Sequence, residues 1–305
     1  MEAHNRPRGV LAAILTPVGR DLAPDHARLI AHARWLLANG CDGLNVLGTT
    51  GEAASFSTAQ RVALMEALAG SGLPLDAMLV GTGAAALADA TVLTRTAIEL
   101  GFGGALVIPP FYYKDVPDDG TFAFYSELIE RSGGAALRLY LYNFPKMSGV
   151  LISPELTGRL IEAFGTTIAG LKDSSGDMTY AAALHRAYPS LDIFPSSEAV
   201  LAECRRSGYA GCISASANVT APYCATVWRG DPGDEAPQVH VAALRAAIAS
   251  VPLIPALRFL VSELHHDADW LRTMPPLASL AESERATLLG RLRAAGYAAP
   301  SGALA

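Results

Sequence analysis

The sequence has no excess of positive charge and few charged residues of either sign. Its 305 residues include 23 Lys and Arg against 29 Asp and Glu, which gives a formal net charge of −6 at pH 7. A protein that releases counterions from phosphates needs a basic surface, so this balance argues against a nucleic-acid partner. Charged residues make up 17% of the chain and hydrophobic residues 51%, which excludes a disordered protein and predicts a large buried core.

Cysteines and long apolar runs are also scarce. Cys41, Cys204, Cys212 and Cys224 are too few and too irregularly spaced for a disulfide framework or a Cys-x-x-Cys metal site, which favours small buried side chains in a reducing compartment. No apolar run approaches the ~18–20 residues that a membrane helix requires, and the N-terminal residues lack the apolar stretch of a signal peptide. We therefore predict a cytoplasmic protein with no membrane partner.

Short runs rich in Val, Ile and Leu alternate along the chain with longer amphipathic, Ala-rich segments. The short runs predict strands at residues 10–15, 43–47, 78–81, 105–108, 137–142, 168–172, 192–195 and 211–214. The segments between them predict helices at 26–39, 58–69, 88–100, 121–131, 154–164, 179–188 and 198–206. Eight strand–helix units in about 215 residues are typical of a closed (β/α)₈ TIM barrel of the α/β class, with a doubly wound open sheet as the alternative.

After Ser214 the alternation ends, and the rest of the chain is predicted to be helical. The expected helices include part of 222–229 and the segments 238–250, 254–264 and 283–295. Gly230-Asp231-Pro232-Gly233-Asp234 separates the first of these from the others, because this composition breaks helices. We therefore assign residues 1–225 to a barrel that carries the active site and residues 226–305 to a C-terminal helical extension.

Lys172 ends the predicted sixth strand, and catalytic groups of TIM barrels lie at the C-terminal ends of strands. Its ammonium would lie at the barrel mouth, partly removed from water, and desolvation favours the neutral amine. A neutral amine attacks a ketone to form a Schiff base, an electron sink that allows the adjacent carbon–carbon bond to form or break. The alternative is a surface lysine at a strand end.

Tyr142 is predicted to lie beside Lys172. Tyr140 and Tyr142 alternate with Leu139 and Leu141, so the tyrosines would face the barrel interior and the leucines the helices. Because the fifth and sixth strands are neighbours, the Tyr142 phenol could pass protons during Schiff-base formation and protonate an acceptor aldehyde. The alternative is a core tyrosine whose hydroxyl bonds the backbone.

Three other segments combine glycine, threonine or histidine in ways that suggest binding. Gly48-Thr49-Thr50-Gly51 offers hydroxyls and backbone N–H groups that suit a small carboxylate, although it is also compatible with ordinary turn chemistry. Gly81-Thr82-Gly83 lacks the third glycine of a dinucleotide site, and His265-His266 has no carboxylate or cysteine at metal-ligand spacing. We expect neither a nucleotide cofactor nor a metal.

Five motifs resemble, in the same order, those of the dihydrodipicolinate synthase / N-acetylneuraminate lyase family. They are Gly48-Thr49-Thr50-Gly51-Glu52, Pro109-Pro110-Phe111-Tyr112-Tyr113, Tyr142-Asn143-Phe144-Pro145, Gly170-Leu171-Lys172-Asp173 and Gly211-Cys212-Ile213-Ser214. Two motifs of the C-terminal part, Pro252-Leu253-Ile254-Pro255 and Met274-Pro275-Pro276-Leu277, extend the resemblance over nearly the whole chain. It implies a (β/α)₈ barrel with C-terminal helices and class I aldolase chemistry on pyruvate or another 2-oxo acid. It also implies that the enzyme uses no metal and no cofactor, because the substrate is activated by a covalent Schiff base on Lys172.

The resemblance also implies roles for single residues. Lys172 corresponds to the Schiff-base lysine, and Tyr142 to the tyrosine that relays protons. Thr49 corresponds to the threonine that links this relay, while Thr50, in the same motif as Gly48, corresponds to the residue that holds the keto-acid carboxylate.

Two further positions concern the pocket wall and the subunit assembly. Ile213 resembles the residue of the eighth strand that packs against bound pyruvate. Tyr112, or Tyr113 if the register differs by one, resembles a tyrosine that family members insert into a neighbouring subunit's site. This implies a homodimer or homotetramer.

Met147 is a departure from one branch of the family. Members that make the lysine precursor have an arginine at this place, which holds the carboxylate of aspartate semialdehyde, and methionine cannot form that ion pair. The lyase and sugar-acid branches have an apolar residue there. The resemblance therefore favours a class I lyase or aldolase with a substrate of the 2-oxo-3-deoxy acid type, whose partners are pyruvate and an aldehyde without that carboxylate.

Three alternatives stay open. They are a 4-hydroxy-tetrahydrodipicolinate synthase acting on pyruvate and aspartate semialdehyde, a dehydratase of a 2-oxo-3-deoxy sugar acid that uses the same lysine, and a non-catalytic barrel that senses keto acids. Intact Lys172, Tyr142 and Thr49 argue against the sensor.

Overall fold

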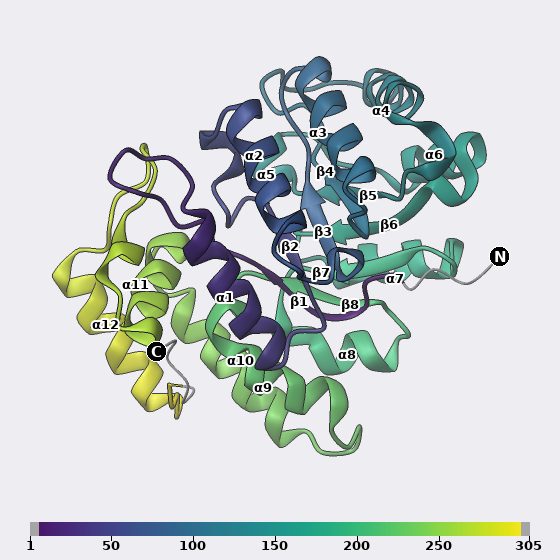
Figure 1. Cartoon of the computed structure of the whole chain (residues 1–305). Coiled ribbons are helices and arrows are strands. Elements are labelled where there is room, and N and C mark those ends of the chain that lie inside the picture. The colour runs from purple at the N-terminus through teal and green to yellow at the C-terminus, as the bar shows by residue number, and fades with distance from the viewer. Residues whose placement is uncertain (1–5, 300–305) are drawn as a thin grey trace.

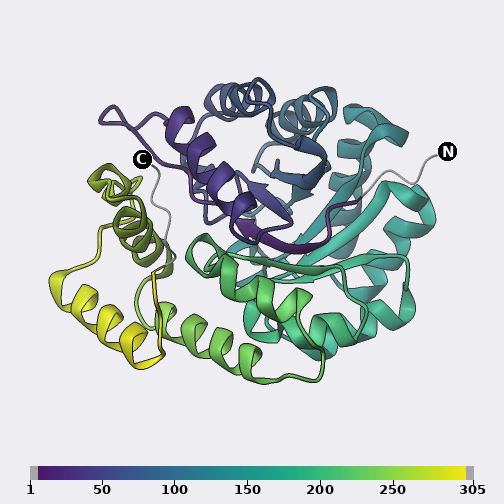
Figure 2. The ribbon, with the colours of Figure 1, turned by 60° about the horizontal axis from the view of Figure 1, so that its bottom comes forward.

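A computed structural model describes residues 6–299, and these form a TIM barrel (Figures 1 and 2). Eight parallel strands follow one another in the order β7-β6-β5-β4-β3-β2-β1-β8. The N–H of Ala210, just before β8, donates to the carbonyl of Ile193 in β7 at 3.0 Å, which brings the two ends of the sheet together. The strands are β1 Gly9–Ala13, β2 Gly43–Val46, β3 Met78–Gly81, β4 Gly104–Val107, β5 Leu139–Asn143, β6 Ile168–Asp173, β7 Asp192–Pro195 and β8 Gly211–Ser214. The predicted barrel is confirmed, and the open doubly wound sheet was the wrong alternative.

Helices surround the strands on the outside (Figure 2). They are α1 His26–Ala38, α2 Thr58–Ala69, α3 Leu87–Glu99, α4 Asp118–Ser132, α6 Pro154–Phe164, α7 Met178–Ala187, α8 Leu201–Arg206 and α9 Ala217–Arg229. Side-chain caps fix several of their first residues. Ser57 accepts the N–H of Gln60 and forms a capping box with it, and Ser153 accepts the N–H of Leu156.

Among the α-helices of residues 6–299, one short helix was not predicted. Helix α5, Pro145–Ser148, follows β5 directly and begins with a proline, which suits the first turn of a helix. The hydroxyl of Ser148 donates to the carbonyl of Phe144 at 3.1 Å, and Gly149 ends the turn with a φ of 70°. Four residues are too few for a periodic pattern, so the sequence did not indicate this helix.

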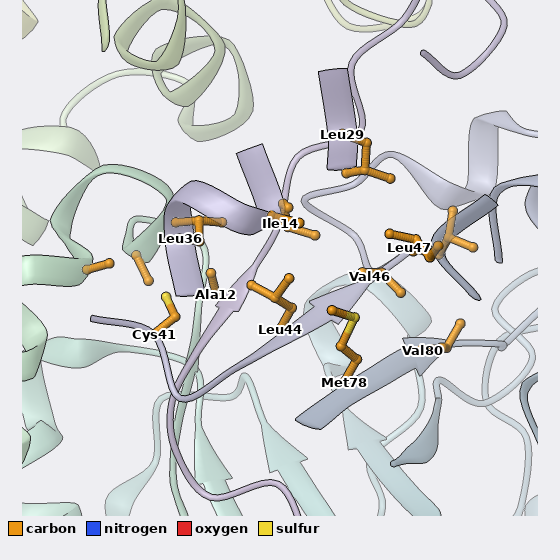
Figure 3. Packing of buried hydrophobic residues seen from close by; sticks show 14 of the residues in the cluster. Ala12, Ile14, Leu29, Leu36, Cys41, Leu44, Val46, Leu47, Met78 and Val80 are labelled. Atoms are coloured by element: carbon orange, nitrogen blue, oxygen red, sulfur yellow. The ribbon is translucent and has the colours of Figure 1, made fainter. Parts of the chain in front are cut away.

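Alternate strand residues pack on opposite faces, as the tyrosine–leucine alternation predicts. Leu139 and Leu141 lie among the helices, whereas Tyr140 and Tyr142 lie in the barrel interior. Figure 3 shows the helix-facing side of the first strands, where side chains of β1, β2 and β3 meet those of α1, among them Ala12, Leu44, Val46, Met78, Val80, Leu29 and Leu36. Each large aliphatic side chain buried there contributes roughly 1.5–3 kcal/mol to stability. All four cysteines are buried and free, as predicted.

Three C-terminal helices, α10 Ala236–Ile248, α11 Leu253–His265 and α12 Glu282–Ala294, gather on one side of the barrel (Figure 1). Helices α10 and α11 both contact α9. The predicted division between residues 225 and 226 falls inside α9, and whether the two parts are separate units stays a prediction. Within residues 6–299 no single helix is long and apolar enough to cross a membrane; α10 and α11 reach that length only together, and they are bent by 109° at their break.

Candidate active site

Lys172 and Tyr142 lie side by side at the C-terminal ends of β6 and β5. The two residues are partners in the strand register. The Lys172 ammonium nitrogen lies 4.4 Å from the centroid of the Tyr142 ring, within the range of a cation–π contact. Both side chains are buried, with Lys172 4% and Tyr142 5% exposed. The predicted pairing of amine and phenol is therefore present.

Thr49 joins this pair through a hydroxyl. Its Oγ1 lies 3.3 Å from the Tyr142 hydroxyl, and either oxygen can be the donor. Gly48 precedes it, and a Cβ at that position would lie 2.5 Å from the side-chain nitrogen of Asn45, so a larger residue would require Asn45 to move. An amine, a phenol and a hydroxyl thus form one continuous row across β6, β5 and the loop after β2.

This row opens into a cavity of about 650 Å³ at the barrel mouth. Most of the predicted site residues line it, namely Lys172, Tyr142, Thr49, Thr50, Ile213 and Met147. A second, more apolar cavity of about 410 Å³ shares three of these residues and is lined in addition by Gly48 and Phe111. Another cavity, of about 470 Å³, lies at the opposite ends of β4 and β5 and contains no predicted site residue.

Tyr112 does not belong to the site of its own chain. Its side chain is 76% exposed and that of Tyr113 is 73% exposed, and the two rings meet edge to face with centroids 5.3 Å apart. Neither of them lines a cavity at the barrel mouth. Whether one of them reaches into a neighbouring subunit stays a prediction.

Buried polar groups hold the ends of β5 and β6 together. Asn143 donates to Asp173 at 2.8 Å, and the same carboxylate accepts the Ser175 hydroxyl at 2.8 Å. The Asn143 amide oxygen accepts the N–H of Ile152 at 3.1 Å. Because Asn143 and Asp173 directly follow Tyr142 and Lys172, these bonds fix the register of the two chemical groups.

A buried ion pair ties the loop after β2 to the C-terminal helices. The Glu52 carboxylate accepts Arg258 Nε at 2.7 Å and the N–H of Met274 at 2.9 Å, and Arg258 Nη2 also donates to the carbonyl of Thr16 at 2.8 Å. Burial lowers the pKa of Arg258, an effect that Glu52 opposes. The pair anchors the segment after Met274, whose Leu277 lines both cavities at the mouth.

This ion pair was not predicted from the sequence, and neither were Arg245 and Ser196, which line the larger cavity. Glu52 and Arg258 are 206 residues apart, and Arg245 has the pattern of an ordinary polar residue on a helix surface. Only the packing of α10 and α11 against the barrel makes them part of the site. Within residues 6–299 no group of three or more His, Cys, Asp or Glu side chains is placed to hold a metal ion.

An amine buried against a phenol at the mouth of a TIM barrel suits the chemistry of class I lyases, in which an amine must reach a ketone while a neighbouring acid–base group moves protons. The molecule is an enzyme of this class. Comparison with known proteins identifies its family: a model of the dihydrodipicolinate synthetase family matches residues 6–294. The chain belongs to this family, as its motifs predicted, and it is a lyase rather than a keto-acid sensor.

Relatives of the chain extend over almost its whole length. An uncharacterized DapA-like lyase of Chloroflexus aurantiacus is 34% identical over 292 residues, which cover 92% of this chain and 95% of the relative. The crystal structure of dihydrodipicolinate synthase from Agrobacterium tumefaciens has a TM-score of 0.87 and 32% identity, covering 94% of this chain and 98% of that one. A dihydrodipicolinate synthase from Acinetobacter baumannii, complexed with pyruvate, has a TM-score of 0.82 and 27% identity, with 95% and 99% covered.

Proposed function

We propose that Lys172 forms a Schiff base with pyruvate or another 2-oxo acid, and that the enzyme makes or cleaves the carbon–carbon bond next to it. The substrate is of the 2-oxo-3-deoxy acid type, with an aldehyde as the second partner. The observation that carries this proposal is the row of Lys172, Tyr142 and Thr49 in a cavity at the barrel mouth. The pyruvate complex of the Acinetobacter relative also supports it.

The geometry suggests a course for cleavage. The Lys172 nitrogen attacks the ketone carbon, and loss of water leaves a protonated imine. Tyr142 removes the proton of the hydroxyl beyond the breaking bond, the aldehyde leaves, and the bonding electrons move into an enamine. Protonation of the enamine carbon and hydrolysis release the 2-oxo acid and restore the amine. Thr49, bonded to the Tyr142 hydroxyl, carries protons to and from it.

The remaining candidate residues hold the 2-oxo acid or cover the aldehyde. Thr50, together with backbone N–H groups of the loop that begins at Gly48, binds its carboxylate, a task for which accessible loop amides are suited. Ile213 packs against its carbon chain, and Met147 covers the side where the aldehyde binds.

The complete enzyme is a homodimer or homotetramer in this proposal. The exposed Tyr112 enters the site of a neighbouring subunit and joins the proton relay there. The four buried, free cysteines support a reducing, cytoplasmic location.

A second candidate is the synthase reaction of pyruvate with aspartate semialdehyde, favoured by the Agrobacterium relative, which is a dihydrodipicolinate synthase. Met147 argues against it, because it provides no positive charge for the semialdehyde carboxylate. Dehydration of a 2-oxo-3-deoxy sugar acid would use the same Lys172 and is the third candidate.

A panel of 2-oxo-3-deoxy acids and of aldehydes with pyruvate, followed by pyruvate release or consumption, tests the proposal. We expect cleavage of at least one 2-oxo-3-deoxy acid, weak condensation with aspartate semialdehyde, and no activity in Lys172→Ala. Efficient condensation with aspartate semialdehyde would establish the synthase instead. Loss of water without pyruvate release would establish the dehydratase.

A further inference from the structure

Arg245 brings a guanidinium from α10 to the cavity that contains Lys172. The side chain is half-buried and lines the cavity together with Ser174 and Ser196. Its Nη1 donates to the Ser216 hydroxyl at 2.7 Å. Among the described residues this is its one side-chain hydrogen bond, and it forms no ion pair there. The other nitrogens of the guanidinium thus remain available to a ligand.

A buried chain of hydroxyls holds this arginine in place. The Ser216 oxygen lies 3.4 Å from that of Ser214, which donates to the Glu198 carboxylate. The other oxygen of that carboxylate accepts the Thr220 hydroxyl at 3.0 Å. Glu198, Ser214, Ser216 and Thr220 are fully buried. Buried polar groups are costly unless they are hydrogen-bonded, so this row of hydroxyls links the Glu198 carboxyl group to the Arg245 guanidinium and fixes the guanidinium at the cavity wall.

The other charged groups of the cavity are less suited to bind an anion. Lys146 is exposed on the short α5, and Lys172 is consumed by the Schiff base. Glu284 of α12 also lines the cavity, and its carboxylate accepts the N–H of Ala281 at 2.8 Å. In the described part of the chain, Arg245 is the one arginine on this wall.

We propose that Arg245 binds a terminal oxyanion, a phosphate ester or a carboxylate with no ammonium beside it, on the half of the substrate that leaves as the aldehyde. Aspartate semialdehyde does not fit this description, because its carboxylate has an ammonium next to it that the Arg245 guanidinium would repel. This inference rests on the proposed function and narrows its substrate class to 2-oxo-3-deoxy acids with an anionic far end. A guanidinium bonds either anion with two parallel N–H donors. In the proposed function, Thr50 and its loop bind the carboxylate next to the ketone. Met147 is uncharged and cannot bind an anion at the other end of the substrate, so the cation for that end is Arg245 of the C-terminal helices.

Pairs of aldehydes, one charged and one neutral, measure the role of Arg245 in binding the anion. Condensation with pyruvate is compared for succinic semialdehyde against butanal and for glyceraldehyde 3-phosphate against glyceraldehyde, in the wild type and in Arg245→Gln, Arg245→Lys and Lys146→Gln. The wild type should prefer one charged aldehyde over its neutral match by at least about tenfold in kcat/KM, as expected for an ion-paired hydrogen bond. Arg245→Gln should abolish this preference and Arg245→Lys should keep part of it, whereas Lys146→Gln should retain it. The preferred pair distinguishes carboxylate from phosphate.

Borohydride trapping of pyruvate on Lys172 distinguishes a failure of the proposed Schiff-base chemistry from a failure of the role proposed for Arg245. The trapped fraction should be the same in Arg245→Gln and the wild type, with similar thermal unfolding midpoints. If the wild type forms no adduct, the proposed function and this inference both fail. If it forms the adduct but has no charge preference, or loses the preference in Lys146→Gln instead, only the inference fails. Loss of the pyruvate adduct in folded Arg245→Gln would mean that Arg245 holds the pyruvate carboxylate. This result would also overturn the inference that Arg245 binds the anion of the aldehyde. Should Arg245→Gln not fold, Ser216→Ala, which removes the bond that holds the guanidinium, must weaken the preference.

Discussion

Tyr142 contacts two of the groups on which the proposed chemistry depends, because its ring lies under the Lys172 amine and its hydroxyl reaches Thr49. These contacts were predictable from the sequence, since strand alternation places Tyr142 in the interior and the βα order makes β5 and β6 neighbours. The roles of Arg245 and Arg258 could not be predicted from the sequence, because helical periodicity does not show which element a helix surface packs against.

Tyr142→Phe keeps the ring beneath Lys172 and removes only the hydroxyl. We expect kcat to fall by about 10²–10⁴, the usual contribution of general acid–base catalysis, while the fold is retained. Steady-state turnover of the best substrate measures the change. Tyr140→Phe is the matched control, because Tyr140 lies on the same strand and face and its buried hydroxyl has no partner in the described structure. Equal losses in the two variants would show that the Tyr142 hydroxyl has no particular role.

At the scale of elements, long-range polar bonds connect the barrel to the C-terminal helices. Glu52 and Arg258 join the loop after β2 to α11, and His32 of α1 meets His265 at the end of α11. The strands and most helices were predicted to within a few residues, and 78–81, 192–195 and 211–214 agree with the structure in both bounds. The contacts between distant elements were not, because local periodicity carries no information on tertiary pairing.

Glu52→Gln leaves the Arg258 guanidinium buried without its counter-charge. We expect the free energy of unfolding to fall by about 3–5 kcal/mol, the usual cost of breaking a buried ion pair from one side. Urea denaturation measures it, with Glu203→Gln, an exposed acid in a surface ion pair, as the control that should change little. The double variant Glu52→Gln/Arg258→Met should recover part of the loss. Equal stability of Glu52→Gln and the wild type would contradict the role given to this pair.

The histidine pair makes stability depend on pH. His32 Nε2 lies 3.1 Å from the Asn218 oxygen, to which it donates, and Nδ1 lies 2.9 Å from His265 Nε2. Burial, and secondarily His265, lowers the pKa of His32 to about 3. Between that value and the ordinary pKa of about 6.5 the unfolded chain binds more protons than the folded one, so acidification destabilises the fold.

Urea denaturation at several pH values between 7 and 4.5 should show this loss, at up to about 1.4 kcal/mol per pH unit for one such histidine. His32→Gln should reduce the slope because it removes the group that titrates. His266→Asn, at an exposed position, should leave the slope unchanged. A slope that is the same in His32→Gln and the wild type would assign the effect to other groups.

At the scale of the whole molecule, the site is built from both parts of the chain. The barrel supplies Lys172, Tyr142 and Thr49, while α10, α11 and the segment after Met274 form part of the cavity wall. The alternation of strands and helices was enough to predict the barrel. How the helical extension covers its mouth depends on tertiary packing and became apparent only in the structure.

Assembly is tested by mixing two inactive variants. In our proposal Tyr112→Ala lacks the partner tyrosine and Lys172→Ala lacks the Schiff base, so each alone should be strongly impaired. After joint refolding in equal amounts, about a quarter of wild-type activity should return, because half of the dimers are hybrids with one complete site each. Tyr113→Ala in place of Tyr112→Ala should be active alone. Failure of the mixture to regain activity would contradict a shared site.

The most direct test of the account is borohydride reduction in the presence of pyruvate, followed by mass spectrometry of the digested protein. The account predicts a reduced pyruvyl group on the peptide that contains Lys172, and no such adduct in Lys172→Ala. A wild-type protein that is folded and saturated with pyruvate, yet carries no modification at Lys172 after reduction, would contradict it.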